Sequence, residues 1–195
     1  HVPFAIAPHY RAHAPFPDPK SFMENYLNAV YVQDHCLGVF YKEYLRFRPG
    51  NSHLFIISDH TWPMRFEGQS FNEQHAFNDN FFTPAAYLPP TDNQSIWRVG
   101  AEEQRWFSQS DLPPTIMELI DGQPRRNSFV FALRRDYPPE NVRYEDCHLL
   151  TQPYSGGILA LIRGRQKILY YAASRRVVAY DLSQDLLEEH PQLLS

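Results

Sequence analysis

Asp59 and His60 directly follow a run of four apolar residues, LFII, and are the first pair in the chain whose types and position suggest chemistry. An apolar run of this length that stops at polar residues predicts a buried strand over residues 53–58. Ligands of open α/β sheets gather outside the carboxyl ends of the strands. Because a carboxylate oxygen and an imidazole nitrogen together suit zinc or manganese, the pair is a candidate metal site. The structural alternative is a solvated turn at the end of the strand.

Other candidates for catalytic residues are weaker. Ser155 lies in PYSGG, which lacks the first glycine of a nucleophile elbow and precedes no predicted helix. Cys36 and His35 are adjacent in a predicted helix, so their side chains point in different directions. His9 and His13 have the spacing of helical zinc ligands, but prolines flank them and the glutamate of a protease motif is absent. The sequence also contains neither a phosphate-binding P-loop nor a dinucleotide-binding glycine motif.

The composition is that of a globular protein, and 195 residues are enough for one domain. The formal net charge of −4, without any basic block, argues against nucleic-acid binding. No apolar run approaches the ~18 residues of a membrane span. Two cysteines can pair in an oxidising compartment or remain apart, and the sequence does not choose. Since the chain begins at His1 without methionine, we expect it to be a fragment with an upstream part elsewhere.

The elements that must position the candidate pair follow from periodicity. Residues 1–20 contain five prolines and predict an extended loop. Apolar residues at three- and four-residue steps predict an amphipathic helix over residues 21–46, with a capping box of Ser21 and Glu24. A turn over residues 49–51 then leads into the strand that precedes the candidate pair. This order of helix, turn and apolar strand predicts an α/β protein with a buried sheet.

Further elements are predicted towards the carboxyl end. Residues 82–88 and 128–133 resemble strands. SDLPPTIMELI predicts a helix that is capped by Ser110 or Asp111, with prolines in its first turn. The segment GILALIRGRQKILYYAASRRVVAYDL breaks into three short strands at its glycine and serine turns, which predicts an antiparallel ribbon or small sheet.

The order of these segments resembles a known family. Six segments occur in the order found in sulfatases: HVPF, NYLNAVYVQDHCLGVFYKEYL, NSHLFIISDH, FFTPAAYLPP, FSQSDLPPTIMELIDG and KILYYAASRRVVAYDLSQDLLEE. More closely, they look like the membrane-anchored relatives that transfer phosphoglycerol or phosphoethanolamine, such as lipoteichoic acid synthase. All of these belong to the alkaline phosphatase superfamily. The resemblance implies that residues 1–195 form the carboxyl-terminal part of an alkaline-phosphatase-like α/β sandwich, with a small antiparallel sheet near the C-terminus.

The resemblance also implies roles for particular residues. Asp59 and His60 match metal ligands, and the metal would be manganese, zinc, magnesium or calcium, among which the sequence does not choose. His1 matches a histidine that contacts the phosphate or sulfate of the substrate, and His75 lies where many members place another active-site histidine. Asp111 matches a position with a structural role, capping the helix that follows it.

The activity implied is that of a metal-dependent sulfatase-like hydrolase or phosphoglycol transferase that acts on phosphate or sulfate esters, such as a lipid head group or a glycan. The nucleophile belongs to the part of the family domain that precedes this chain, so the fragment alone should be inactive. Its implied location is the outer face of a bacterial membrane, through upstream segments. The alternative is a non-catalytic module that recognises an anionic lipid or glycan, which is favoured by Thr61 in place of the glycine that the family commonly has there.

Overall fold

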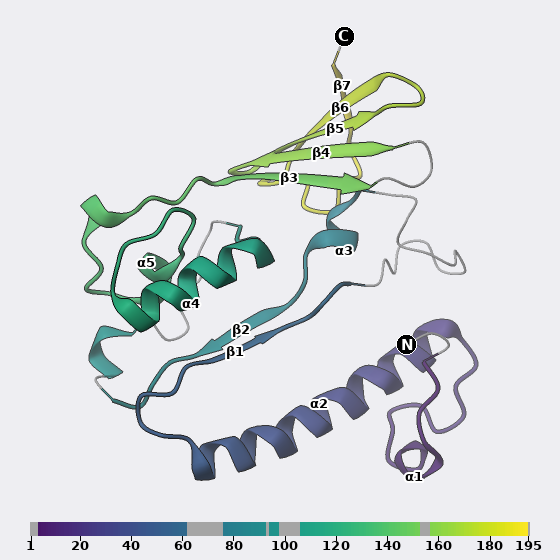
Figure 1. Cartoon of the computed structure of the whole chain (residues 1–195). Coiled ribbons are helices and arrows are strands. Elements are labelled where there is room, and N and C mark those ends of the chain that lie inside the picture. Colours follow the sequence, from purple (N-terminus) through teal and green to yellow (C-terminus); the bar gives the residue numbers. More distant parts are fainter. Residues whose placement is uncertain (1–3, 62–75, 93, 98–105, 153–156, 195) are drawn as a thin grey trace. The chain divides into compact units, whose positions relative to one another are not determined.

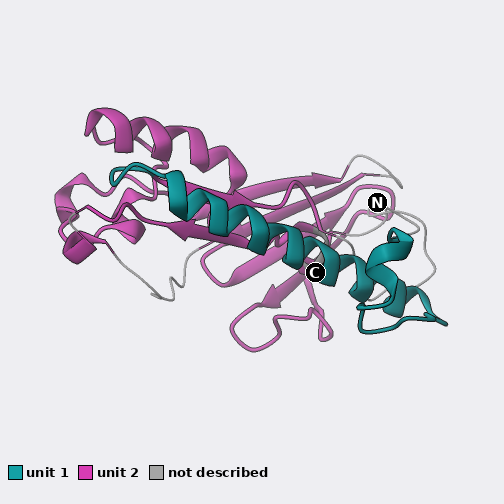
Figure 2. Ribbon diagram, turned by 90° about the horizontal axis from the view of Figure 1, so that it is seen from below, with its two compact units in different colours: residues 1–52, 62–70 teal, residues 53–61, 71–195 magenta. Residues whose placement is uncertain are grey.

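The computed structural model describes residues 4–61, 76–92, 94–97, 106–152 and 157–194 (Figure 1). The chain divides into two units. The first comprises residues 1–52 and 62–70, and the second comprises residues 53–61 and 71–195 (Figure 2). No helix in the described part of the chain is both long enough and apolar enough to cross a membrane. Cys36 lies in the first unit and Cys147 in the second, and both are free thiols.

The first unit contains the long helix that the sequence predicts. Helix α2 spans Phe22–Phe47, and the predicted capping box is present: the Ser21 side chain accepts from the Glu24 amide, and the Glu24 carboxylate accepts from the Ser21 amide. Buried Asn28 accepts from the Phe16 amide at 3.0 Å and donates to the Phe16 carbonyl at 2.7 Å. These two bonds hold the proline-rich segment against the helix. That segment is not entirely a loop, because it contains a single helical turn, α1, over Pro8–Arg11.

The second unit begins with the strand that carries the candidate pair. Strand β1, Leu54–Ile57, pairs antiparallel with β2, Ala85–Leu88, in a two-stranded sheet. The predicted strand at 53–58 is therefore confirmed, but its predicted burial is not: Leu54, Phe55 and Ile56 are half-buried, and Ile57 is 45% exposed. The strand predicted over residues 82–88 is shorter, since β2 begins only at Ala85, and three residues separate it from the end of a helical turn, α3, Asn78–Phe81.

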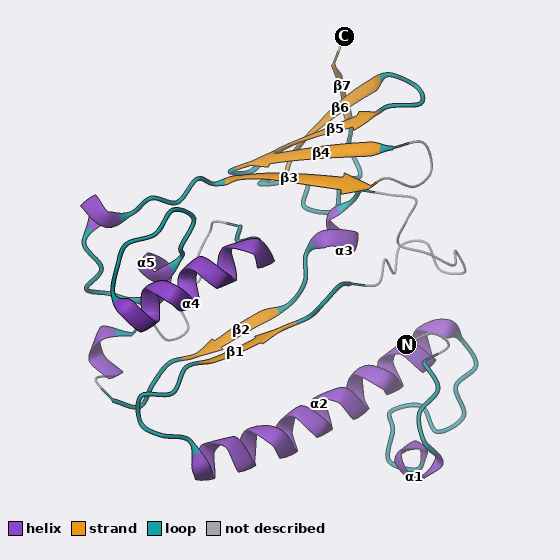
Figure 3. Cartoon of the chain, viewed as in Figure 1, coloured by secondary structure: helices purple, strands orange, loops and turns teal. Residues whose placement is uncertain are grey.

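A five-stranded antiparallel sheet forms the carboxyl-terminal part of the chain (Figure 3). Its strands follow one another in order along the chain: β3 Cys147–Gln152, β4 Ile158–Arg163, β5 Gln166–Tyr171, β6 Arg176–Asp181 and β7 Gln192–Leu194. The three strands predicted from the tail correspond to β4, β5 and β6, and the predicted small antiparallel sheet is confirmed. The inner face of this sheet forms the hydrophobic core, around Ile158, Ala160, Ile162, Leu169 and Val178. The described part of the fold is thus a mixed α/β structure with two antiparallel sheets.

One local prediction is wrong, and another is confirmed only in part. Residues 128–133 are not a strand, because Val130–Leu133 form a helical turn, α5, closed by the bond from the Arg134 amide to the Val130 carbonyl. A short apolar run alone does not distinguish a strand from a buried helical turn. The predicted helix is α4, Leu112–Asp121, and Asp111 is its N-cap residue, but the Asp111 side chain makes no cap bond to α4 and instead closes a capping box with Ser108 around the preceding 3₁₀ turn, η4, Gln109–Asp111.

A buried ion pair lies among the apolar residues of the core. Lys167 on β5 and Glu188, in the loop between β6 and β7, have fully buried side chains, and their charged atoms are 2.7 Å apart. Asn78 is the first residue of α3. Its side-chain oxygen accepts from the Lys167 ammonium at 2.9 Å, and its backbone N–H donates to the Glu188 carboxylate at 2.5 Å. Charges buried in this way need such partners. The three residues therefore join β5, α3 and the carboxyl-terminal loop.

The buried phenol of Tyr180 predicts a loss of stability at high pH. Burial, with smaller contributions from Tyr171 and Glu188, raises the pKa of Tyr180 from 10.0 to about 12. The folded state therefore favours the neutral phenol. The neutral phenol therefore contributes about 2–3 kcal/mol to the free energy of unfolding. This contribution is complete below pH 10 and is lost as the pH rises to 12. We expect urea denaturation to show that the free energy of unfolding falls less between pH 10 and 12 in Tyr180→Phe than in the wild type. Tyr170→Phe, which alters a half-exposed phenol of the same sheet, should behave as the wild type does.

Candidate functional site

Asp59 and His60 lie two and three residues beyond the end of β1, at its carboxyl end, as the sequence predicts. Their side chains are 87% and 57% exposed, so neither is held by burial in the core. The Asp59 carboxylate accepts from the His60 amide at 2.9 Å, and the Ser58 hydroxyl donates to the His60 carbonyl at 2.7 Å. These local bonds form a tight turn that presents both side chains on the same side.

The geometry of the pair fits two ligands of one metal ion. His60 Nδ1 is 2.9 Å from the Thr61 carbonyl, which can only accept, so Nδ1 carries the hydrogen and Nε2 keeps its lone pair. Metal-binding histidines commonly donate their other N–H to a carbonyl in this way. His60 Nε2 is 3.6 Å from an Asp59 oxygen. Two tetrahedral ligands at about 2.1 Å from one ion lie roughly 3.4 Å apart, so these atoms can bind the same ion with little movement.

The pair does not complete a metal site by itself. Among the residues that the structure describes, no group of three or more histidine, cysteine, aspartate or glutamate side chains converges on one point. A structural metal site needs four ligands and a catalytic one commonly needs three. Asp59 and His60 therefore fit part of a metal site whose remaining ligands must come from outside the described residues.

The candidate pair opens onto a cleft of about 710 Å³ in the second unit. The cleft receives residues from the turn after β1, from the end of α3 through the start of β2, from the segment before α4, and from the inner face of the five-stranded sheet. Its polar lining consists of Asp59, His60, Thr83, Ser108, Gln109, His148 and Gln152, and its apolar lining of Phe81, Phe82, Ala85, Trp106, Phe107, Leu150 and Ile162. A mostly apolar cleft with a few converging polar groups is the usual form of a small-molecule site.

Gln109 joins two walls of this cleft. Its side-chain amide donates to the Ser58 carbonyl at 2.5 Å and lies 3.4 Å from the Asp59 carbonyl. The bond ties the turn that carries the candidate pair to the start of α4, which is 50 residues away in sequence. The backbone of Asp59 is therefore fixed although its side chain is exposed.

Aromatic rings form the apolar wall. The rings of Phe82 and Trp106 are stacked, with centroids 4.2 Å apart, and the Arg165 guanidinium lies 4.6 Å from the Trp106 ring. Phe107 packs against Phe129 and Tyr144, with centroid distances of 4.7 and 5.2 Å. Such contacts hold the rings in place, so this side of the cleft is an apolar wall of fixed shape.

His148 is a polar residue of the cleft that the sequence analysis did not select. It lies on β3, its side chain is 10% exposed, and its Nε2 is 2.9 Å from the Trp106 carbonyl. The Tyr144 hydroxyl and an Asp146 carboxylate oxygen lie 3.4 and 3.5 Å from the same nitrogen. The alternation of CHLLTQ along β3 carries the available signal, because it places His148 on the same face as Leu150 and Gln152.

Two predicted site residues, His1 and His75, lie outside the described residues, as does Ser155, which the sequence made a weak candidate. Asp111 is described and has a structural role: its carboxylate accepts from the Ser108 amide at 2.7 Å and lies 2.9 Å from the Tyr144 hydroxyl.

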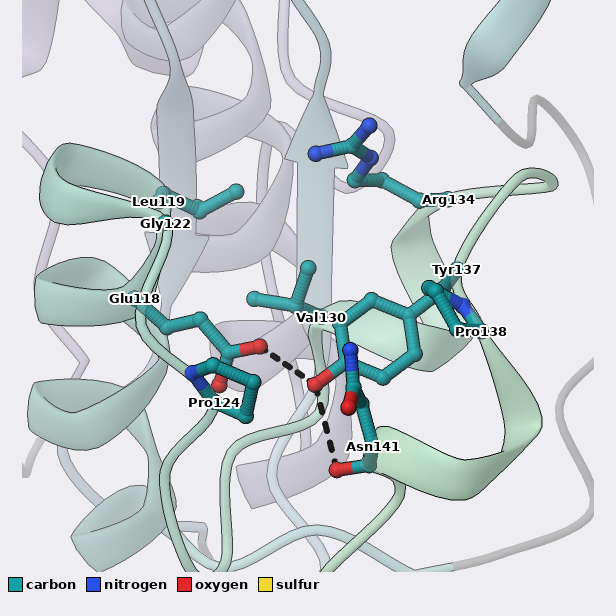
Figure 4. A pocket seen from close by; sticks show the side chains of 9 residues that line it. All are labelled: Glu118, Leu119, Gly122, Pro124, Val130, Arg134, Tyr137, Pro138 and Asn141. Carbon is teal, nitrogen blue, oxygen red and sulfur yellow. Dashed lines mark hydrogen bonds between the residues drawn. The ribbon is translucent and has the colours of Figure 1, made fainter.

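A second, smaller cavity of about 110 Å³ lies beside α4 (Figure 4). Buried Glu118 points towards Tyr137, whose hydroxyl donates to the Glu118 carboxylate at 2.5 Å. The carboxylate also accepts from the Arg125 amide at 2.9 Å. Burial, and then Glu118, raises the pKa of the Tyr137 phenol. Each oxygen of Glu118 thus accepts a hydrogen bond from the loops that follow α4. This indicates that Glu118 has a structural role beside this cavity.

Comparison with known proteins finds similarity to a solved structure. The chain matches no family model and no curated protein. It is similar to the crystal structure of Ps i-CgsB, with a TM-score of 0.69 and 17% sequence identity over 98% of this chain. The chain spans 43% of the length of that protein. At this identity the likeness establishes a shared fold, and a fold alone does not determine the chemistry of a site.

Proposed function

We propose that this chain is part of a metal-dependent sulfatase-like hydrolase or phosphoglycol transferase that acts on phosphate or sulfate esters, with the fold of an alkaline-phosphatase-like α/β sandwich. One observation carries the proposal. Asp59 and His60 stand at the carboxyl end of β1, with the lone pair of His60 Nε2 free and 3.6 Å from an Asp59 oxygen, at the mouth of a 710 Å³ cleft. A solvated turn needs neither this tautomer nor this cleft.

Asp59 and His60 would hold the divalent ion. When bound, such an ion neutralises charge on phosphate or sulfate oxygens and lowers the pKa of a nucleophilic hydroxyl. Asp59 contributes negative charge to the site, and His60 contributes a neutral nitrogen ligand. Gln109 keeps the backbone of this turn in place through the Ser58 carbonyl.

The remaining residues of the cleft would bind and orient the ester. The Phe82–Trp106 stack would offer the organic part of the ester an apolar surface to pack against. By resemblance, His1 and His75 would hold the charged oxygens of the substrate or protonate the leaving group. The nucleophile would come from a part of the protein that precedes this chain in the family, where its identity separates phosphoryl transfer from sulfate hydrolysis.

The test is turnover by the full-length polypeptide that contains this chain. We expect hydrolysis of a chromogenic phosphodiester or a sulfate ester that requires manganese, zinc, magnesium or calcium. Loss of a residue that merely supports a metal ligand costs 10- to 100-fold in metal affinity or activity, so Asp59→Ala and His60→Ala should each cost at least about 100-fold. Calorimetric titration should show the same loss in metal affinity.

Matched variants separate this effect from a general one. Asp92→Ala and His190→Ala change exposed residues that do not line the cleft, and both should retain wild-type turnover and metal affinity. A folded full-length protein that turns over neither ester with any of the four metals would contradict the proposal. That result would favour the non-catalytic module, in which the cleft binds an anionic lipid or glycan without reaction.

A further inference from the structure

We propose that His148 recognises a hydroxyl group on the alcohol portion of the ester, and so determines specificity at the side of the cleft formed by the five-stranded sheet. This inference rests on the proposed function. It concerns a residue on β3, about 90 positions after the candidate metal ligands, that none of the sequence patterns singled out.

The hydrogen bonds of His148 fix which ring nitrogen faces a ligand. Nε2 is 2.9 Å from the Trp106 carbonyl, and because a carbonyl can only accept, Nε2 carries the hydrogen. The neutral imidazole then has its lone pair on Nδ1. Nδ1 makes no hydrogen bond with the described residues, while the ring lines the cleft. The group that His148 offers to a ligand is therefore an acceptor.

The surroundings of Nε2 hold the ring in this state. The Tyr144 hydroxyl lies 2.6 Å from the Trp106 carbonyl and 2.9 Å from the Asp111 carboxylate, so it connects the acceptor of His148 to the start of α4. An oxygen of Asp146 is buried, has no hydrogen-bond partner among the residues that the structure describes, and lies 3.5 Å from Nε2. Nε2 thus faces hydrogen-bond acceptors. If the ring flipped and placed its unprotonated nitrogen at this position, the lone pair of that nitrogen would face these acceptors, which is unfavourable.

The rest of the cleft agrees with a hydroxylated ligand. The His148 side chain is 10% exposed and lines the cleft, so a ligand in the cleft can reach it. The Thr83 hydroxyl supplies a further group that can donate or accept. The rings of Phe82 and Trp106 provide an apolar surface for the carbon skeleton of a polyol or sugar. A site built to bond a hydroxyl rejects the analogue that lacks it, because its own polar atom is then buried unpaired.

Two sources share this chemistry: the glycerol of a lipid head group and a sugar ring. The test uses calorimetric titration of the full-length polypeptide in manganese with two matched pairs of probes. Glycerol phosphate is compared with propyl phosphate, and glucose sulfate with cyclohexylmethyl sulfate, which lacks the hydroxyls. We expect the wild type to prefer the hydroxylated member of at least one pair, and the pair with the larger preference identifies the source.

The variants test the role of Nδ1. His148→Phe, which keeps a ring but removes the acceptor, should reduce the preference for the hydroxylated probe about tenfold, the worth of one hydrogen bond of about 1.4 kcal/mol. Affinity for the deoxy probe should change less than twofold. His148→Gln, which restores an acceptor, should recover part of the preference, and His190→Phe should match the wild type.

The possible outcomes separate this inference from the proposed function. Equal weakening of both members of a pair in His148→Phe would show a structural role and overturn the inference. Wild-type turnover of esters without any preference for hydroxyls would overturn the inference and leave the proposed function standing. A preference that depends on His148 in a protein without turnover would support the inference and contradict the proposed function.

Discussion

Lys167→Met is expected to lower the free energy of unfolding by about 3–5 kcal/mol, the usual cost of removing one partner of a buried ion pair. The ammonium and the Glu188 carboxylate are both fully buried and 2.7 Å apart. Methionine fills a similar volume, so the loss arises because the carboxylate remains buried without its cation. Since native domains are stable by about 5–15 kcal/mol, this single change removes a large share of the total. Urea denaturation followed by circular dichroism measures it.

The double variant Lys167→Met/Glu188→Gln distinguishes charge from packing. In the wild type the Asn78 backbone N–H donates to the Glu188 carboxylate at 2.5 Å. Glutamine keeps an acceptor oxygen for this N–H, and the double variant has no buried charge at the two positions. We expect it to recover most of the lost stability, because replacing both charges of a buried pair is often neutral or stabilising. Arg163→Met removes an exposed positive charge from the same sheet and should cost less than 1 kcal/mol. A double variant no more stable than Lys167→Met would contradict this explanation.

Asp111→Ala is expected to cost about 3 kcal/mol, because several bonds depend on one buried carboxylate. It closes the capping box through the Ser108 amide at 2.7 Å and lies 2.9 Å from the Tyr144 hydroxyl. Loss of a capping residue costs about 0.5–2 kcal/mol, and hydrogen bonds to charged groups contribute about 1.5–3 kcal/mol. The same change should disturb Trp106 on the cleft wall, whose carbonyl lies 2.6 Å from the Tyr144 hydroxyl.

Equilibrium denaturation and affinity for a cleft ligand measure the two consequences separately. Asp111→Asn keeps one acceptor oxygen and should lose less stability than Asp111→Ala. Asp92→Ala removes an exposed carboxylate from the same unit and should lie within 0.5 kcal/mol of the wild type. An Asp111→Ala protein as stable as Asp92→Ala would show that the hydrogen bonds of the buried carboxylate contribute nothing net.

The elements with strong periodicity could be predicted from the sequence, and the short ones could not. Helix α2 has 26 residues, a capping box and a recurring apolar face, and each of these signals predicts a helix. The strands β4 to β6 are joined by tight turns, so local residues determine their pairing. In contrast, α5 has four residues, and its conformation depends on the Thr115 hydroxyl, which accepts from the Phe129 amide 14 positions away. No local pattern records such a contact.

The candidate site divides in the same way. The position of Asp59 and His60 at the end of a strand follows from the adjacent apolar run, so the sequence predicts it. Gln109 and His148 contribute to the same cleft from 50 and 89 positions beyond Asp59, and only tertiary structure brings them together. Their residue types are common on protein surfaces, so neither stands out without its neighbours.

The buried ion pair also bears on how the five-stranded sheet finds its alignment. Both faces of this sheet are apolar, since Leu149, Leu159, Leu161 and Ile168 are exposed on the face opposite the core. A strand slipped by one residue would exchange its two faces, and apolar contacts alone would penalise that slip only weakly. Lys167 makes the two alignments unequal. After a slip of β5 its ammonium would leave Glu188 and Asn78, and the carboxylate would stay buried alone. The buried Lys167–Glu188 ion pair therefore favours the native alignment of the strands over the slipped one.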